Sequence, residues 1–295
     1  MVWLGPATYP SRETEMWTRT LLMACGPLLA GRLIGSWSGF QWPPGANCRT
    51  GLVPPSLTGY HPPVPDVASG IGTLREKPLH ASLKRWYARA GDRIEVAVDG
   101  YVVDLVRGDL LLEIQTRGFS GMRPKVAALL AGGHRVRLIH PIAVDRWIVK
   151  VDADGAILSR RRSPRHGIPA DLVSELVSFP DLLAHPCLEV ELLMTVEEEW
   201  RRHDPGRSWR RHGWTIVERR LLDVLGSTAL THPGDLASLL PAAIPEAFTT
   251  ADLAAALARP RRTAQLMAYC LRKLGLIHAV GIRGRSPEYR LVTRG

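Results

Sequence analysis

The pattern of apolar and polar positions over residues 101–116 predicts a β-hairpin. Its two halves are rich in Val, Leu and Ile, and Gly108-Asp109 between them is a two-residue turn signal. If these two residues form the turn, Arg107 pairs with Leu110. In that register one face of the hairpin is almost wholly apolar, so we expect this face to meet the core.

The other face of this hairpin places Asp104 directly opposite Glu113. Directly opposed residues have Cβ atoms about 4.5–5.5 Å apart, and like charges so placed destabilise a sheet unless something compensates. A divalent cation would compensate, and Mg²⁺ prefers oxygen ligands such as carboxylates. The hairpin therefore predicts a site for Mg²⁺ (or Mn²⁺) with Asp104 and Glu113 as its metal ligands.

Helical and strand periods surround the hairpin in a definite order. We expect a helix from residue 79, a strand at 92–99, the hairpin, a helix from 122 to 131, and strands at 134–142 and 145–152. A helix separates the hairpin from the next strand, so that strand is expected to run parallel to its neighbour. Three polar residues flanking the hairpin are expected to be surface or structural residues: His80, Lys84 and His140.

This element order, with its two acids and the Glu-Ile-Gln triplet at 113–115, resembles the PD-(D/E)XK nuclease superfamily over about residues 74–151. The resemblance implies an α/β (α+β) fold with a restriction-endonuclease-like core and a mixed sheet. It also implies metal-dependent hydrolysis of phosphodiester bonds. Members that cut duplexes commonly work as dimers, so a homodimer is an expectation.

Carried over to this chain, the superfamily pattern defines a catalytic set of Asp104, Glu113, Gln115 and Lys125. Asp104 and Glu113 match the two metal-binding acids, and Gln115 stands where a lysine is usual. Gln115 cannot supply positive charge. Lys125 on the following helix, or Arg117 on the loop, is expected to supply it, and Lys125 is favoured because variants of the superfamily displace a basic residue onto that helix.

Beyond residue 214 the composition shifts toward Ala and Leu. The pattern predicts helices at 214–225, 235–241, 249–260 with Thr249 or Thr250 as N-cap, and 261–277, then two short strands around Gly284. Residues 214–293 thus resemble a winged helix-turn-helix, which implies either DNA binding or protein contacts. In the DNA-binding reading the helix and wing contribute Arg261, Arg262, Gln265, Arg272, Lys273, Arg283 and Arg285.

Two arginine-rich blocks lie at 159–166 and 201–212. Such blocks usually form solvated loops but can neutralise phosphates. Between them we expect a helix, a strand at 188–192 and a further helix. The predicted organisation is a nuclease-like domain at 74–200, a basic linker at 201–213 and the winged module. The residues expected to meet phosphates outside that module are Arg117, Arg160, Arg161 and Arg162.

The amino-acid composition limits the classes of binding partner that we expect. The formal net charge of +10 and the pI near 9.9 indicate a polyanionic partner, and DNA fits the motifs better than a membrane. Residues 1–70 are rich in Pro and Trp and poor in charge, so we interpret them as disordered or as an extension from a misassigned start codon. The scattered cysteines indicate reduced thiols and a cytoplasmic location.

The leading hypothesis is a Mg²⁺-dependent DNA endonuclease-like protein. The alternatives are a catalytically inactive DNA-binding regulator that uses the nuclease-like fold as a scaffold, and a protein-interaction adaptor. Gln115 in place of lysine is the feature that separates the first two.

Overall fold

The computed structural model describes residues 77–204, 206 and 212–292. The expectations for residues 1–70 lie outside the described residues. The fold is mixed α/β, with a seven-stranded mixed sheet in the order β1-β2-β3-β4-β6-β7, β5 pairing with β4, and a separate three-stranded sheet. The predicted fold class is confirmed at this level.

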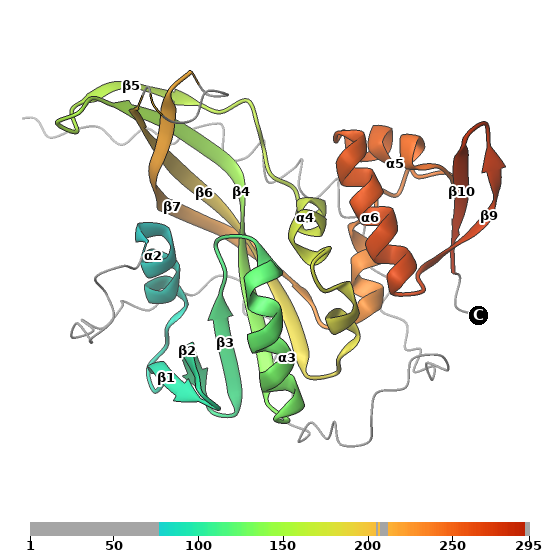
Figure 1. Cartoon of the computed structure of the whole chain (residues 1–295), viewed down its shortest axis with the longest axis horizontal. Coiled ribbons are helices and arrows are strands. Elements are labelled where there is room, and N and C mark those ends of the chain that lie inside the picture. The colour runs from blue at the N-terminus through green and yellow to red at the C-terminus, as the bar shows by residue number, and fades with distance from the viewer. Residues whose placement is uncertain (1–76, 205, 207–211, 293–295) are drawn as a thin grey trace, which may run out of the picture. The chain divides into compact units, whose positions relative to one another are not determined.

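The N-terminal half of the described chain forms a helix, an antiparallel meander, a crossover helix and a parallel strand (Figure 1). Its elements are α2 (Pro78–Tyr87), β1 (Arg93–Val98), β2 (Tyr101–Arg107), β3 (Leu110–Ile114), α3 (Arg123–Ala131) and β4 (Arg135–Val151). The meander strands pair antiparallel, whereas β3 and β4 pair in parallel. This order and this parallel pairing are those predicted from the sequence.

The hairpin register is also confirmed, because Arg107 pairs with Leu110. The predicted apolar face reaches the core, where Leu105 and Leu112 are fully buried beneath Leu83 of α2. All of β3 is buried, so the opposite face is desolvated as well. β3 is therefore covered on both faces, whereas Val102 of β2 is exposed, and Asp104 is half-buried beside the buried Glu113.

Long strands extend the sheet beyond the meander. The two strands expected between 134 and 152 are one strand, β4, with a bulge between Ala143 and Asp145 in its pairing to β6. The remaining elements are β5 (Ile157–Arg162), η3 (Pro169–Leu172), α4 (Val173–Leu176), η4 (Pro180–Ala184), β6 (Leu188–His203) and β7 (Trp214–Leu230), with η2 (Phe119–Met122) ahead of α3.

Three expectations for residues 194–225 are wrong. The helix expected after residue 192 is the continuation of β6, and the helix expected at 214–225 is β7. The basic linker expected at 201–213 does not separate two domains, because β6, which ends at His203, pairs antiparallel with β7, which begins at Trp214, in one sheet. Glu, Arg and Leu favour helices locally, but pairing along the full length of β6 overrides that preference.

The C-terminal elements form a helix pair and a small sheet. After η6 (Pro233–Leu239) come β8 (Ala247–Phe248), α5 (Thr250–Leu257), α6 (Arg261–Lys273), β9 (Ile277–Arg283) and β10 (Ser286–Leu291). The sheet order is β8-β10-β9. The two predicted helices and the terminal hairpin are confirmed, but this group of elements starts after β7 rather than at residue 214.

An arginine joins this group to the larger sheet domain. Arg259, just past α5, contacts both carboxylate oxygens of Asp171, at 2.8 Å through Nε and 3.1 Å through Nη2, and Nη2 also donates to the carbonyl of His166 at 2.5 Å. Such bidentate geometry is among the stronger forms of ion pair. α6 also contacts α4 nearby.

Thr249 is the N-cap of α5, since its side-chain oxygen accepts hydrogen bonds from the backbone N–H groups of Ala251 and Asp252. We expect Thr249→Ala to lower the free energy of unfolding by about 1 kcal/mol, because two backbone donors lose their partner. Thr250→Ala, one residue into the helix, is the matched control and is expected to change it by less than about 0.5 kcal/mol. Urea unfolding measures both, and equal losses would contradict the assignment of the cap.

The cysteine expectation is partly wrong. Cys270 is a free, buried thiol, but Cys187 is disulfide-bonded. A cytoplasmic location therefore stays a prediction that Cys187 does not support. No helix within the described ranges combines the length and apolar character needed to cross a bilayer.

Candidate active site

Asp104 and Glu113 lie where the β2–β3 ladder ends. The last pairing in the ladder joins Leu105 to Leu112, and beyond it the carboxylate of Asp104 accepts a hydrogen bond from the backbone N–H of Ile114 at 2.8 Å. Glu113 is only 3% exposed. The structure therefore brings the two predicted acids together in a partly desolvated position.

Lys125 of α3 reaches this acid pair. Its Nζ lies 2.5 Å from Oε1 of Glu113 and donates to the backbone carbonyl of Val102 at 2.6 Å. The crossover helix therefore places one positive charge between the two hairpin strands. This contact agrees with the expectation that the helix, rather than position 115, supplies the basic residue.

His80 is a member of the cluster that sequence reasoning missed. Its Nε2 lies 3.2 Å from Oδ2 of Asp104. Lys84, one turn further along α2, is buried and donates to Glu95 at 2.6 Å, so the expectation that both are surface residues is wrong. The helical spacing of His80 and Lys84 showed that they share a face of α2, but only the packing of α2 shows that this face meets the hairpin.

The two acids have opposite pKa shifts. Burial, together with the negative charge of Asp104, raises the pKa of Glu113 to about 7, even though Lys125 opposes this rise. Burial alone would raise the pKa of Asp104 too, but the hydrogen bond and charge of His80 outweigh it and lower that pKa below its usual value. A pair of carboxyl groups with separated proton affinities is typical of functional sites.

Gln115 is directed away from this cluster. Its side-chain Nε2 donates to the carbonyl of Gly118 at 2.9 Å, which turns the amide toward the following loop. Arg117 on that loop is exposed and, among the described residues, has no carboxylate partner. The supply of charge to the acid pair therefore falls to Lys125 and not to Arg117.

The donor set fits Mg²⁺ or Mn²⁺ to a limited extent. Asp104 and Glu113 offer carboxylate oxygens, and Mg²⁺ commonly takes one or two carboxylates and completes its shell with water and substrate phosphate. Within the described part of the chain, no group of three or more His, Cys, Asp and Glu residues has the arrangement of a metal site. Any cation held here would therefore depend on water and substrate for most of its ligands.

The arginines of β5 are largely engaged with acids. Arg160 pairs with Glu198 at 2.8 Å and stacks on the ring of Trp147, while Arg162 lies 2.5 Å from Asp145. Arg161 is exposed. Of the three predicted phosphate contacts on this strand, Arg161 is the least engaged with acids.

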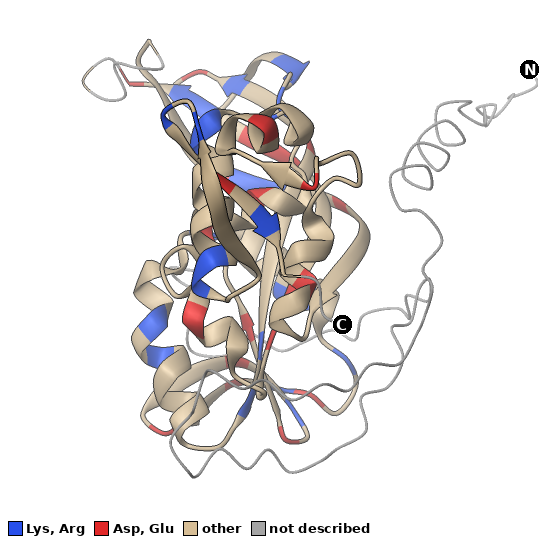
Figure 2. Ribbon diagram, turned by 90° about the vertical axis from the view of Figure 1, so that its right-hand side faces the viewer, with Lys and Arg blue, Asp and Glu red and all other residues tan. Residues whose placement is uncertain are grey.

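The predicted contacts of the C-terminal elements gather more closely. Arg261, Gln265 and Arg272 of α6 line one hollow of about 300 Å³ together with Arg285 of the β9–β10 turn. Arg262 and Lys273 are exposed on the same helix. Arg283 instead pairs with Asp252 and Glu288, so it braces the hairpin against α5. Over the whole molecule, basic residues are spread across strands and helices alike (Figure 2).

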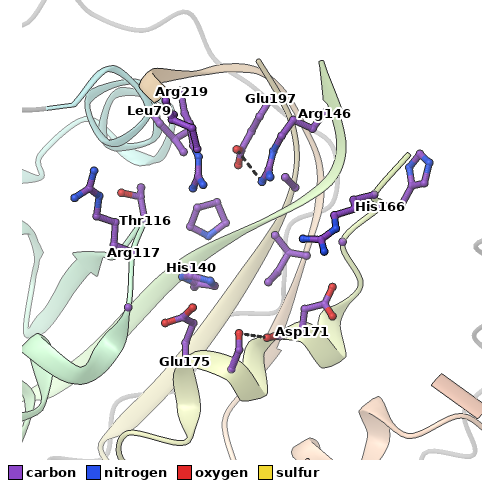
Figure 3. A pocket seen from close by; sticks show the side chains of 18 of the residues that line it. Leu79, Thr116, Arg117, His140, Arg146, His166, Asp171, Glu175, Glu197 and Arg219 are labelled. Carbon is purple, nitrogen blue, oxygen red and sulfur yellow. Dashed lines mark hydrogen bonds and ion pairs between the residues drawn. The ribbon is translucent and has the colours of Figure 1, made fainter. Parts of the chain in front are cut away.

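A larger cavity of about 920 Å³ was not anticipated from the sequence (Figure 3). It lies along β4 between the part that pairs with β3 and the part that pairs with β5. Its walls come from segments far apart in the chain, so no local motif announces it. Its labelled polar residues include Arg117, His140, Glu175 and Arg219.

Two comparisons give the family. Residues 77–231 match the domain of unknown function DUF8091. A protein of Treponema pallidum (strain Nichols), described as an uncharacterized protein, is 32% identical over 225 residues, which cover 75% of this chain and 87% of that protein. No solved structure matches the chain.

The chain therefore belongs to the DUF8091 family. The matched region starts at the residue before α2 and ends just after β7. It contains the whole seven-stranded sheet and leaves the C-terminal helix pair outside, which agrees with a boundary after β7.

Proposed function

We propose that this protein is a Mg²⁺-dependent (or Mn²⁺-dependent) DNA endonuclease-like enzyme that hydrolyses phosphodiester bonds and binds DNA through its C-terminal elements. The observation that carries the proposal is the convergence of Asp104, Glu113 and Lys125 at the open end of the β2–β3 ladder. Two acids from adjacent strands and a lysine from the crossover helix form the arrangement that the PD-(D/E)XK resemblance implies.

The residues have separable roles in this proposal. Asp104 and Glu113 would hold the cation, which when bound supplies Lewis acidity and activates water. Glu113 would hold the cation as its carboxylate, and because its pKa is raised to about 7, cation binding near neutral pH would release a proton to solvent. Lys125 would leave Glu113 and stabilise the negative charge that develops on the phosphate. A fixed cation is most effective there because the site contains little water.

The DNA-binding part of the proposal rests on the C-terminal hollow. Three side chains of α6 and Arg285 of the adjacent turn face a common space, which fits a helix and wing that contact one duplex. Phosphate contacts of this kind give affinity without reading the sequence. A homodimer remains a prediction.

A second candidate is the catalytically inactive DNA-binding regulator. The contact of Gln115 with Gly118 favours it, because the residue at the usual lysine position is directed elsewhere. In this reading the ion pair between Lys125 and Glu113 is structural and stands in place of a cation.

Incubating the full-length protein with linear, supercoiled and branched DNA decides between the two. We expect cleavage with Mg²⁺ or Mn²⁺ and none with chelator, because the acids alone cannot activate water. Calorimetric titration with Mn²⁺ gives a readout independent of cleavage. Tight DNA binding without cleavage under any metal would favour the regulator and end the enzymatic proposal.

A further inference from the structure

The large cavity begins one residue away from the acid pair. Leu79 lines it, and the next residue, His80, contacts Asp104. On the other side the cavity is lined by Thr116 and Arg117, which follow Glu113 closely in the chain. Adjacent Cα atoms lie about 3.8 Å apart, so a chain that passes the acids is close to the cavity.

Two of the arginines that line the cavity form no ion pair with a carboxylate of the described residues. Arg117 and Arg165 come from different loops, are exposed, and have no carboxylate partner within the described residues. Arg219 of β7 also lines the cavity, but it forms an ion pair with Glu199 at 3.7 Å. Converging cations without partners provide the charge-assisted donors that a phosphate group accepts.

Most of the carboxylates around the cavity are already engaged. Asp171 is held by Arg259, Glu218 by Arg220, and Glu197 by Arg146 together with the hydroxyl of Thr195. Burial also raises the pKa of Glu197, so its negative charge is weakened. These acids therefore offset little of the attraction that the rim cations exert on an anion.

The interior suits a base more than a bare phosphate. Pro141, Ile142 and Ala143 of β4 give an apolar wall. Beside it Glu175 points toward the ring of His140 (Figure 3), and the side-chain carboxylate of Glu175 has no hydrogen-bond or ion-pair partner in the described part of the chain. Burial lowers the pKa of His140, which leaves a neutral ring. A flat apolar surface with a free carboxylate acceptor complements a nucleobase that carries amino groups.

The volume of the cavity limits the size of the ligand that it can hold. A volume of about 920 Å³ is in the range of sites that enclose one small organic molecule. A nucleotide or a short stretch of one strand fits this space, whereas an intact duplex does not enter it.

From these observations we infer that the cavity binds a nucleotide of an unpaired DNA strand beside the bond to be cut, so that the substrate is tailed or branched DNA rather than intact duplex. This inference rests on the proposed function. The rim arginines hold the phosphate, and the β4 wall with Glu175 and His140 receives the base.

Fluorescence anisotropy with the full-length protein in chelator tests the inference without cleavage. The probes are a blunt DNA hairpin and the same hairpin with an unpaired 5′ or 3′ deoxycytidine tail, whose bases carry the amino group that Glu175 would accept from. We expect at least one tailed probe to bind about tenfold more tightly, the gain from one or two charge-assisted contacts. Equal affinity for blunt and tailed probes would overturn the inference.

Substitutions locate the effect. Arg117→Gln combined with Arg165→Gln is expected to remove the preference for the tail and to lower the salt dependence of tail binding by about 0.7 in log–log slope, the contribution of one single-strand phosphate contact. The matched control is Arg85→Gln with Arg89→Gln, which removes two exposed charges outside the cavity, one from α2 and one from the turn after it. A tail preference that persists in the first variant, or vanishes in the control, overturns the assignment.

Competition separates a strand from a free nucleotide. We expect deoxycytidine monophosphate to displace the tailed probe only at concentrations far above those of a short oligodeoxycytidine, and equal competition would overturn the strand assignment. The proposed function can fail independently. Tail-dependent binding without metal-dependent cleavage would end only the enzymatic proposal, and cleavage without tail preference would end only this inference.

Discussion

Replacing Glu113 with glutamine is expected to raise the free energy of unfolding at pH 8 by about 3 kcal/mol. In the folded protein the pKa of Glu113 is raised from 4.5 to about 7 by burial and by the charge of Asp104. Between these two values the folded state keeps a proton that the unfolded chain has lost. Stability therefore falls as the pH rises through this window, by about 1.4 kcal/mol for each pH unit that separates the folded pKa from the unfolded pKa.

The pH dependence identifies the cause. At pH 4 Glu113 is protonated in both states, so Glu113→Gln is expected to change stability there by less than about 0.5 kcal/mol. Urea unfolding at pH 4 and pH 8 measures the difference. Asp109→Asn, at the exposed turn of the same hairpin, is the control and should be neutral at both values. Destabilisation by Glu113→Gln at pH 8 would show that its ion pair with Lys125 outweighs its burial.

Asp104→Asn is expected to reduce metal-dependent cleavage by about a thousandfold or more while DNA binding is retained. The substitution removes one of two carboxylates that would hold the cation, and a cation contributes several kcal/mol of charge stabilisation in such reactions. Single-turnover cleavage with Mg²⁺ and anisotropy with chelator measure the two quantities separately. Asp109→Asn again serves as the control, and a cleavage rate of Asp104→Asn equal to that of the control would remove the acid pair from the mechanism.

The same cleavage assay compares the two candidates for the basic role. Lys125→Met should cause a large loss, because Lys125 contacts Glu113 directly. Gln115→Met should cause a small one, because that amide is bonded to Gly118. The reverse ranking would return the role to position 115.

Local pattern was sufficient to predict the hairpin and its acids. Alternation and the Gly108-Asp109 turn determined the register, and the register alone placed Asp104 opposite Glu113. These features depend on residues close together in the chain, so the sequence contains them directly. Lys125 was expected from the resemblance to the PD-(D/E)XK superfamily, and only the packing of α3 shows its contact with Glu113.

Where a segment pairs or packs with distant parts of the chain, its local sequence pattern did not predict its structure or its contacts. The sequence of β7 has the composition of an amphipathic helix, and only its pairing with β6 makes it a strand. His80 reaches Asp104 through the packing of α2, which no spacing within α2 reveals. The large cavity is assembled from loops and strands far apart in the chain, so the sequence marked Arg117 as a phosphate contact without showing that it shares a cavity with Arg165.

The bidentate ion pair between Arg259 and Asp171 would fix the distance between α6 and the two acids. It ties the segment that leads into α6 to the domain that carries the two acids, and its bidentate geometry resists rotation. If the protein binds DNA through α6, it would cut at a constant distance from the site where α6 contacts the DNA. Breaking this ion pair would make the distance from the bound helix to the cleaved bond variable, while DNA binding and hydrolysis themselves stay unchanged.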